Sequence, residues 1–325
     1  MTKIILDVDT GMDDAVAITV AALSKELEIL GITVTHGNQP LENTLENTLR
    51  VVELLGKDIP VYGGCPEPMV QYLLSGRTSN VRKQTIRKVI DGEVITIHQK
   101  HIDLPKATIE SQKKHACTFL IETLKNTKEK ITLVPVGPLT NIGMALRMDP
   151  SIKENIEEIV IMGGGINHGN RTPVAEANFY DDPEAAQIVM SSGCKIRVMT
   201  LEATESVLFT RDDAKKFRNG SKVGTFIANL IEKYILNCEL LGISDDGSVS
   251  IHDAVAVCAV IDPSVVTDIR CKNCDIDFSG GFADGQLLVD NRTFIKPHSK
   301  TYIAYATNRD KCLEMMVSTI NNEYE

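Results

Sequence analysis

Four carboxylates lie within eight residues near the start of the chain, in the segment Asp7-Val8-Asp9-Thr10-Gly11-Met12-Asp13-Asp14. The segment follows an apolar run and contains no Lys or Arg. Grouping like charges costs free energy unless a cation or strong hydrogen-bond donors compensate. Carboxylate oxygens, together with backbone carbonyls and water, suit Ca²⁺ or Mg²⁺, whereas zinc favours Cys and His. The segment therefore predicts a site for a hard divalent cation.

Two other interpretations of this segment are possible. Asp13 and Asp14 could simply cap the helix that follows, but this leaves Asp7 and Asp9 at the end of a buried strand unexplained. Metal-dependent phosphatases that form an aspartyl phosphate also end a strand in Asp-x-Asp, followed two positions later by Thr or Val. Gly11 stands at that position here, which weakens the phosphatase hypothesis.

Apolar runs of strand length alternate with segments of helical period along most of the chain. The expected strands are residues 3–8, 28–35, 131–136, 156–162 and 195–199, and the expected helices are 13–24, 41–55, 109–126, 139–148 and 183–191. The strands are nearly continuous in Ile, Leu and Val, which is typical of strands buried on both faces. The alternation predicts an α/β fold with a mostly parallel central sheet and helices on both faces, a Rossmann-like open sheet.

In open parallel sheets, ligands bind beyond the carboxyl ends of the strands. The residues directly after the expected strands are therefore candidates for chemistry, and they are small or polar: Asp9 to Asp14, His36-Gly37-Asn38, Gly137-Pro138 and Gly163-Gly164-Gly165. Residues 72–106 are irregular and basic, and we expect a solvated loop and helix there, or else a surface insertion or lid. From Lys222 onward we expect further helices, with strands near 265–278, 286–289 and 301–306.

Composition limits the possible partners and the cellular setting. With 44 acidic against 34 basic side chains, nucleic acid is a poor default partner. No apolar run approaches the length of a membrane span and no signal peptide is evident, so we expect a cytoplasmic protein that binds no membrane. The eight cysteines are dispersed and should be free thiols, with Cys271-x-x-Cys274 beginning a strand. No repeat or linker divides the chain, which predicts a single domain over residues 1–325.

Four motifs, widely separated and in a fixed order, give a resemblance to a known family. They are Asp7-Val8-Asp9-Thr10-Gly11-Met12-Asp13-Asp14-Ala15, then Val134-Pro135-Val136-Gly137-Pro138-Leu139-Thr140-Asn141, then Ile161-Met162-Gly163-Gly164-Gly165 with Val174-Ala175-Glu176-Ala177-Asn178 and Asp182-Pro183-Glu184-Ala185-Ala186, and finally Ile251-His252-Asp253-Ala254. With these motifs the sequence resembles the inosine-uridine preferring nucleoside hydrolases, which cleave the N-glycosidic bond of ribonucleosides to free base and ribose.

The resemblance implies a bound Ca²⁺ and a set of ligands for it. The matching positions are Asp9, Asp14, Asp253 and the backbone carbonyl of Val136. Water and the ribose 2′- and 3′-hydroxyls would complete the coordination. The positions that correspond to sugar-binding residues are Asp13, Asn38, Asn170, Glu176 and Asn178, with Met162 beneath the ribose. Asp7 would not contact the ion itself but would support the residues that do.

The resemblance also implies a reaction. Cleavage at C1′ builds positive charge on the sugar, which nearby carboxylates and amide oxygens can stabilise. Ca²⁺ would hold the attacking water and lower its pKa, and Asp9 would accept the proton as general base, with inversion and no covalent intermediate. His252 is the candidate to protonate the departing base, because imidazole titrates near neutral pH. We interpret His36 and His98 as structural histidines.

The sequence departs from the family pattern in two places. Val136 stands where Thr is common, and residues 97–105 replace a longer loop containing glycine near the base pocket. Tyr234 is a candidate to close over the base. The chain contains no tryptophan, which excludes stacking of the base between tryptophan rings and favours the inosine-uridine type.

Two further expectations concern partners and activity. The family resemblance suggests a homodimer or homotetramer that binds a small-molecule ribonucleoside. The alternative function is a non-catalytic ribose or nucleoside binding protein, but the intact set Asp9, Asp14, Asn38 and Asp253 argues against a loss of activity.

Overall fold

The computed structural model describes residues 1–74 and 86–321, and its centre is an eight-stranded sheet in the order β11-β14-β8-β7-β6-β1-β2-β3. The strands are β1 (Thr2–Val8), β2 (Leu27–Val34), β3 (Val61–Gly63), β6 (Ile131–Pro135), β7 (Ile156–Met162), β8 (Ile196–Met199), β11 (Val266–Cys271) and β14 (Thr301–Thr307). All neighbouring strands run parallel except β11 and β14. The predicted α/β fold with a mostly parallel sheet is therefore confirmed.

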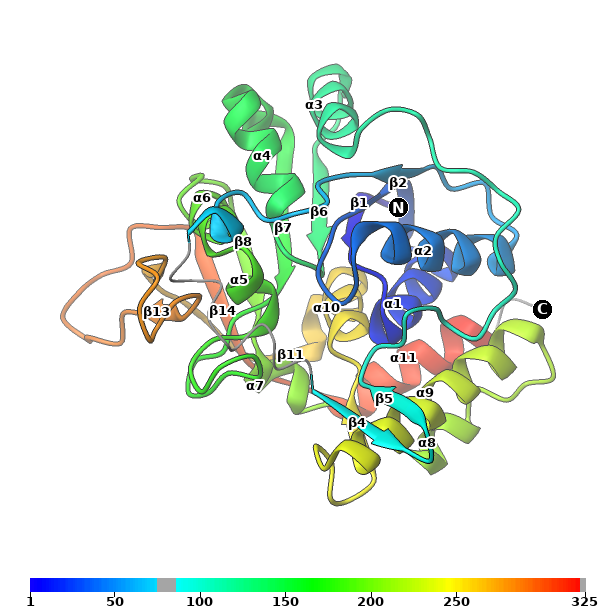
Figure 1. The fold of residues 1–325 in the computed structure, drawn as a ribbon. Helices are drawn as coiled ribbons and strands as arrows, with labels where there is room; N and C mark the ends of the chain where they lie inside the picture. The colour runs from blue at the N-terminus through cyan, green and yellow to red at the C-terminus, as the bar shows by residue number, and fades with distance from the viewer. Residues whose placement is uncertain (75–85, 322–325) are drawn as a thin grey trace.

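Alternate residues of the strands supply two separate apolar cores, one on each face of the sheet. In β1, Ile4, Leu6 and Val8 belong to one core, whereas Ile5 belongs to the other. The first core is covered by α1 (Met12–Leu23), α2 (Leu41–Leu55), α9 (Lys222–Leu241), α10 (His252–Ile261) and α11 (Arg309–Asn321). The second is covered by α3 (Ala116–Asn126), α4 (Thr140–Met148) and α6 (Pro183–Met190). Figure 1 shows these two groups of helices on opposite sides of the sheet.

The helix starts follow from local capping. At α6 the Asp182 carboxylate accepts a hydrogen bond from Ala185 N at 3.0 Å, and proline occupies the first turn. The expected helix over residues 109–126 is wrong in its first half. Gln112 N instead donates to Val61 O at 2.8 Å beside β3, and α3 begins only at Ala116, where the His115 ring accepts from Cys117 N.

In the basic stretch from Tyr72 to Lys106, the described residues after 85 form a β-hairpin where we expected a loop and helix. β4 (Arg87–Ile90) and β5 (Glu93–Thr96) pair antiparallel around Asp91 and Gly92, whose φ angles are 52° and 86°. Positive φ at both central residues is the geometry of a tight hairpin turn, for which Asp-Gly is a favoured pair. A short 3₁₀ helix covers Gln71–Leu73. Arg77, Arg82 and Lys83 of this stretch lie outside the described residues.

The strand expected over residues 265–278 is divided in two. β11 ends at Cys271, and β12 (Cys274–Ile276) leaves the central sheet to pair with β13 (Leu287–Val289). Cys274 therefore begins a strand, whereas Cys271 ends one, and both are free thiols. Smaller elements complete the described chain: η2 (Pro150–Asn155), α5 (Ala177–Asp181), α7 (Leu201–Glu205), β9 (Leu208–Thr210), α8 (Arg211–Lys215), β10 (Ser248–Ser250) and η3 (Pro263–Val265).

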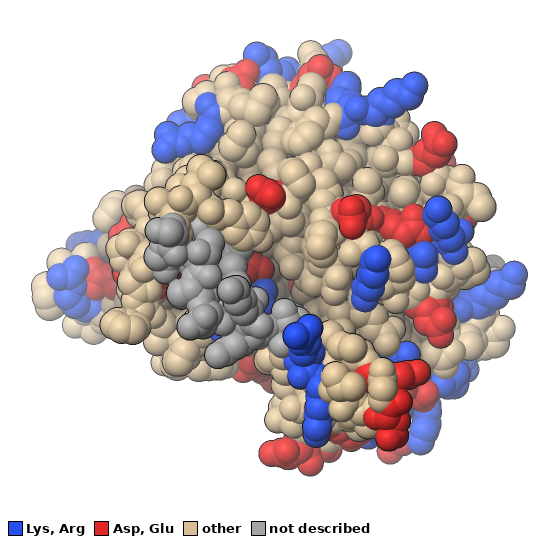
Figure 2. All heavy atoms as spheres, in the orientation of Figure 1, with Lys and Arg blue, Asp and Glu red and all other residues tan. Residues whose placement is uncertain are grey.

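Two surface features bear on possible partners. None of the helices in the described part of the chain is both long enough and apolar enough to cross a bilayer. On the face drawn in Figure 2, acidic and basic side chains are interspersed and lie mainly toward the margin.

Candidate active site

The sheet has a topological switch point between β1 and β6. The chain passes from β1 to β2 on one side of β1, whereas β6 pairs with its other side. Such a point leaves a crevice at the carboxyl ends of the strands. A cavity of about 600 Å³ lies there, and the residues predicted from the sequence that line it are Asp9, Asp13, Asn38, Val136, Met162, Asn170, Glu176, Asn178, His252 and Asp253.

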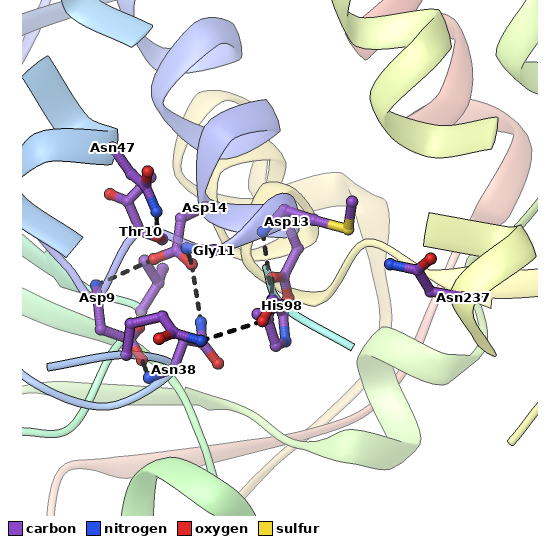
Figure 3. A network of polar contacts seen from close by, with 12 residues as sticks. Asp9, Thr10, Gly11, Asp13, Asp14, Asn38, Asn47, His98 and Asn237 are labelled. Atoms are coloured by element: carbon purple, nitrogen blue, oxygen red, sulfur yellow. Dashed lines mark hydrogen bonds and ion pairs between the residues drawn. The ribbon is translucent and has the colours of Figure 1, made fainter. Parts of the chain in front are cut away.

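Three buried carboxylates meet beside this cavity. Asp13 and Asp14 stand in the first turn of α1 and Asp253 in the first turn of α10, and these three groups offer oxygens within 4.8 Å of one another. Asp14 accepts hydrogen bonds from Gly11 N at 2.8 Å and from Asp9 N at 3.1 Å (Figure 3). Asp13 Oδ1 is buried and has no hydrogen-bond partner among the described residues. Asp14 and Asp253 are 239 positions apart in the sequence. The starts of α1 and α10 thus bring together carboxylates from distant parts of the chain.

Asp9 stands at the edge of this group and is held by the loop after β2. Its Oδ2 accepts a hydrogen bond from Asn38 N at 2.6 Å. A Cβ atom on Gly37, whose φ is 153°, would lie 2.1 Å from Asp9 Oδ2, and one on Gly137 would lie 2.7 Å from Oδ1. Glycine is therefore required at both positions for the backbone to approach the Asp9 carboxylate.

The environment of these carboxylates opposes their ionisation. Burial raises the pKa values of Asp13 and Asp14 to about 6, and for Asp14 the charge of Asp13 adds to the effect. The pKa values of Asp9 and Asp253 are raised well above their ordinary value, first by burial and then by the neighbouring carboxylates. A hard cation would remove both the repulsion and the unsatisfied Asp13 oxygen. The donor set therefore fits Ca²⁺ or a similar ion.

Three of the residues expected to bind the sugar, Asn170, Glu176 and Asn178, make further hydrogen bonds in the cavity lining. Asn178 Nδ2 donates to Val136 O at 2.7 Å and to Met162 O at 3.1 Å. Glu176 caps α5, accepting hydrogen bonds from Gly164 N and Asn178 N, both at 2.9 Å. Burial raises the pKa of Glu176 to about 7. The side chain of Asn170 already makes one hydrogen bond within the protein, because its Oδ1 accepts from Ala177 N at 2.9 Å.

His252 lines the cavity, but its imidazole does not titrate near neutral pH as the residue type led us to expect. Burial, with a contribution from His98, lowers the pKa of His252 to about 4, so the ring is mainly neutral at pH 7. Its Nδ1 lies 2.7 Å from the Thr204 hydroxyl oxygen. If Thr204 donates this hydrogen bond, Nε2 carries the ring proton and can donate it in turn.

His98, interpreted from the sequence as a structural histidine, is held by a backbone hydrogen bond and also lines the cavity. Met12 N donates to His98 Nδ1 at 3.2 Å. Since a backbone N–H can only donate, Nδ1 is unprotonated and Nε2 carries the proton. Burial lowers the His98 pKa to about 4, in agreement with a neutral ring. His36, by contrast, is buried outside the cavity lining, with Nε2 3.1 Å from Thr140 Oγ1.

The atypical segment 97–105 is fastened to α2, which explains how it still delivers His98 to the cavity. Asn47 Nδ2 donates to Lys100 O at 3.3 Å and Asn47 Oδ1 accepts from Ile102 N at 3.2 Å. Arg50 Nη1 donates to Ile102 O and to Leu104 O at 3.2 and 2.9 Å. The segment is therefore anchored along its length.

Several cavity residues could not be identified from the sequence. They are Gln39, Ile86, Thr96, Ile97, Arg171, Asp181, Glu205, Cys238 and Ile243. Tyr234, which the sequence singled out, does line the cavity, and its ring centroid lies 5.8 Å from that of His98. Tyr234 thus places an aromatic ring beside His98 in the cavity lining, and an aromatic side chain there suits a planar base.

Comparisons with known proteins agree with this geometry. The model of the family described as inosine-uridine preferring nucleoside hydrolase matches residues 4–314. The pyrimidine-specific ribonucleoside hydrolase RihB of Escherichia coli K12 is 34% identical over 309 residues, which cover 95% of this chain and 93% of that protein. Among solved structures, a purine-preferring ribonucleoside hydrolase from Gardnerella vaginalis superposes with a TM-score of 0.85 at 30% identity, covering 99% and 98% of the two chains. The plant nucleoside hydrolase PpNRh1 gives 0.82 at 28% identity, covering 98% and 99%.

Proposed function

Since the chain belongs to the inosine-uridine preferring nucleoside hydrolase family and is therefore an N-glycosyl hydrolase, we propose that it cleaves ribonucleosides to free base and ribose with the help of a bound Ca²⁺. The observation that carries this proposal is the group of buried carboxylates at the switch point of the sheet. No cation side chain neutralises this group in the hydrogen bonds and ion pairs found among residues 1–74 and 86–321, apart from a 3.8 Å approach of His98 to Asp13.

The ion would be held by Asp9, Asp14, Asp253 and the carbonyl oxygen of Val136. Asp13 lies within the same group and could contact either the ion or a ribose hydroxyl. The carbonyl of Val136 already accepts from Asn178, but a carbonyl oxygen has a second lone pair. When bound, Ca²⁺ would orient the ribose diol and lower the pKa of the attacking water.

Asp9 is proposed to accept the proton of the attacking water. Its carboxylate lines the cavity and is fixed by Asn38 N, so it is positioned before substrate arrives. The burial that raises its pKa also increases its affinity for a proton. Water would add to C1′ as the bond to the base breaks, giving inversion at C1′ without a covalent intermediate.

The departing base needs a hydrogen-bond donor, and two histidines are placed to supply one. The base acquires negative charge as its bond to C1′ breaks. When Thr204 donates a hydrogen bond to Nδ1 of neutral His252, the ring proton is on Nε2 and can be donated to the departing base. His98 already presents an Nε2–H, since its Nδ1 accepts from Met12 N. We therefore propose that His252 assists the leaving group and that His98 provides a second donor at the same end of the cavity.

The proposed substrates are ribonucleosides of the inosine and uridine type. The Escherichia coli relative is named pyrimidine-specific and the Gardnerella structure purine-preferring, so relatives of both preferences resemble this chain. The chain has no tryptophan, and the base end of the cavity contains Tyr234 and Ile97. A purine held between tryptophan rings is therefore excluded.

The test is the release of free base and ribose from inosine, uridine, cytidine, adenosine and guanosine, with Ca²⁺ or with chelator. We expect release of both products in equal amounts from at least one nucleoside and loss of release with chelator. As a matched control, the surface variant Asp212→Asn should behave as the parent protein, because this carboxylate is 85% exposed and remote from the cavity. Calcium-loaded protein that binds nucleosides but releases no base from any of them would contradict the proposal.

The remaining expectations are also proposals. We propose that residues 1–325 fold as one domain, which is supported by a central sheet that draws strands from both ends of the chain. We propose a cytoplasmic homodimer or homotetramer. Light scattering coupled to size-exclusion chromatography would test the oligomer, and a monomeric mass at micromolar concentration would contradict it.

A further inference from the structure

The two ring nitrogens of His252 face different surroundings. Nδ1 lies 2.7 Å from Thr204 Oγ1, and the Thr204 side chain is fully buried and does not line the cavity. Nε2 makes no hydrogen bond within the described part of the chain, yet it is not fully buried. Because His252 lines the cavity, Nε2 is the ring nitrogen that a ligand there can reach.

The hydrogen atom of the Thr204 hydroxyl decides which of these nitrogens carries the ring proton. His252 Nδ1 lies 2.7 Å from Oγ1, whereas the carbonyl oxygens of Thr200 and Leu201 lie at 3.2 and 3.3 Å. If the hydroxyl donated to a carbonyl, Nδ1 would donate to Oγ1, and Nε2 would be an acceptor without a proton. If the hydroxyl donates to Nδ1, the proton of the neutral ring is on Nε2.

The distances favour donation from Thr204 to His252. Hydroxyl hydrogen bonds to oxygen usually span about 2.5 to 3.0 Å, and both carbonyl contacts exceed this range. Thr200 O, moreover, already accepts a hydrogen bond from Thr204 N at 3.0 Å. The 2.7 Å contact with Nδ1 is therefore the bond that the hydroxyl donates, and Nε2 is left as a donor.

The fold holds Thr204 in a fixed position beside the ring. Ser250 Oγ donates to Thr204 O at 2.9 Å, which ties Thr204 to the strand that ends two residues before His252. The start of α7 is attached to the central sheet, because Thr200 Oγ1 donates to Ala304 O of β14 at 2.7 Å. The hydroxyl therefore meets the ring at a position that the packing of α7 defines.

We propose that Thr204 is a positioning residue whose hydroxyl fixes the ring proton of His252 on Nε2 and so keeps a hydrogen-bond donor available to the departing base. The inference rests on the proposed function, in which His252 assists the leaving group. The base gains negative charge as its bond to C1′ breaks, so an N–H stabilises it and a bare nitrogen lone pair does not. Thr204 acts only through His252, since it does not line the cavity.

The first test measures the tautomer of His252 directly and requires no activity. The seven histidines of the calcium-loaded protein are labelled with nitrogen-15, and the signals of His252 are identified by their loss in His252→Ala. The spectra are recorded at about pH 8, where imidazole is neutral. We expect the proton on Nε2 of the parent protein, and a proton on Nδ1 would overturn the proposal.

The second test measures kcat and KM of Thr204→Val, which keeps the shape of the side chain but lacks the hydroxyl. For the nucleoside that the protein hydrolyses best, we expect kcat to fall by about 10- to 100-fold with KM nearly unchanged, because the donor acts in the transition state. An activated aryl riboside, whose leaving group needs no donor, should be hydrolysed at nearly the parent rate. Equal losses on both substrates would reveal a purely structural role and overturn the proposal.

Three further measurements separate the contact from effects of packing. Thr204→Ser keeps the hydroxyl and should recover most of the parent kcat. Ser250→Ala removes a hydrogen bond to Thr204 O but leaves the contact with the ring, so it should not change the ratio of the two substrates. In a His252→Ala background, Thr204→Val should lower kcat no further. A further loss in that background, or no recovery in Thr204→Ser, would contradict action through His252.

Failure of this inference and failure of the proposed function give different results. If the parent protein releases no base from any nucleoside, the proposed function fails, while the tautomer of His252 still tests the inference. If base is released but Nδ1 carries the proton, the inference fails and the proposed hydrolysis stands. The tautomer measurement also holds if Thr204→Val does not fold, because it uses the parent protein.

Discussion

Removal of divalent cations should make the stability of this protein depend more strongly on pH. Burial raises the pKa values of Asp13 and Asp14 from 3.8 to about 6, so each carboxyl binds a proton more tightly in the folded chain than in the unfolded chain. This contribution to stability is fully present below pH 3.8 and is lost as the pH rises through about 6. The cation-free protein should therefore lose stability between mildly acidic and neutral pH.

The magnitude follows from the size of the shift. A rise from 3.8 to about 6 in one group corresponds to roughly 3 kcal/mol of lost stability at pH 7.5. Asp13 and Asp14 are neighbours, so their two shifts are not simply summed. For a chain of 325 residues, roughly 3 kcal/mol lowers the thermal midpoint by about 4 °C. A bound Ca²⁺ should abolish this loss by neutralising the carboxylates.

The assay is calorimetry at pH 5.5 and pH 7.5, on protein freed of cations by dialysis and on the same protein saturated with Ca²⁺. Asp7 and Glu176 also have pKa values raised to about 7 by burial, but they titrate in both forms. The difference between the thermal midpoints of the Ca²⁺-saturated and the cation-free protein therefore reports on the acidic cluster alone. One group with a pKa of about 6 loses only about 0.8 kcal/mol between these two pH values, so we expect the calcium-induced increase to be larger at pH 7.5 by about 1 °C for each such group. An equal increase at both pH values, or none, would refute this reasoning.

Three substitutions test individual parts of the site. Asp9→Asn should lower kcat by a factor of about 10² to 10⁴ without loss of helical circular dichroism, and a near-normal rate would remove Asp9 as the base. His252→Ala should impair nucleosides with poor leaving groups more than an activated aryl riboside, so equal losses on both would contradict its role. Gly37→Ala should lower kcat/KM at least about tenfold, because its Cβ would lie 2.1 Å from Asp9 Oδ2. Unchanged kinetics of Gly37→Ala would show that this close approach is unimportant.

The parts of the fold that the sequence predicts well are those determined by local pattern. The continuous apolar runs at β1 and β7 are buried on both faces, and this alone identifies them as central strands. The Asp91-Gly92 pair is a local signal for the hairpin turn between β4 and β5. The late start of α3 could not be read locally, because Gln112 is drawn into pairing with Val61 across 51 residues.

The same distinction holds for the site. The acidic segment predicts a cation site because its like charges need compensation, and Asp13 and Asp14 do lie together beside the cavity. The role of His98 depends on a hydrogen bond from Met12 N, 86 positions away, so no local pattern indicates it. The contact of Thr204 with His252 likewise joins residues 48 positions apart. The low pKa of His252 results from burial, which the residue type alone does not convey.

The central claim is that a calcium ion at the carboxylate cluster is required for hydrolysis. The most direct measurement is the rate of base release from the best nucleoside substrate by cation-free protein to which Ca²⁺ is returned in steps, with bound calcium measured in parallel. We predict that the rate rises in proportion to bound calcium and reaches its plateau at about one ion per chain. A full rate in the cation-free protein, or calcium binding that leaves the rate unchanged, would contradict the account.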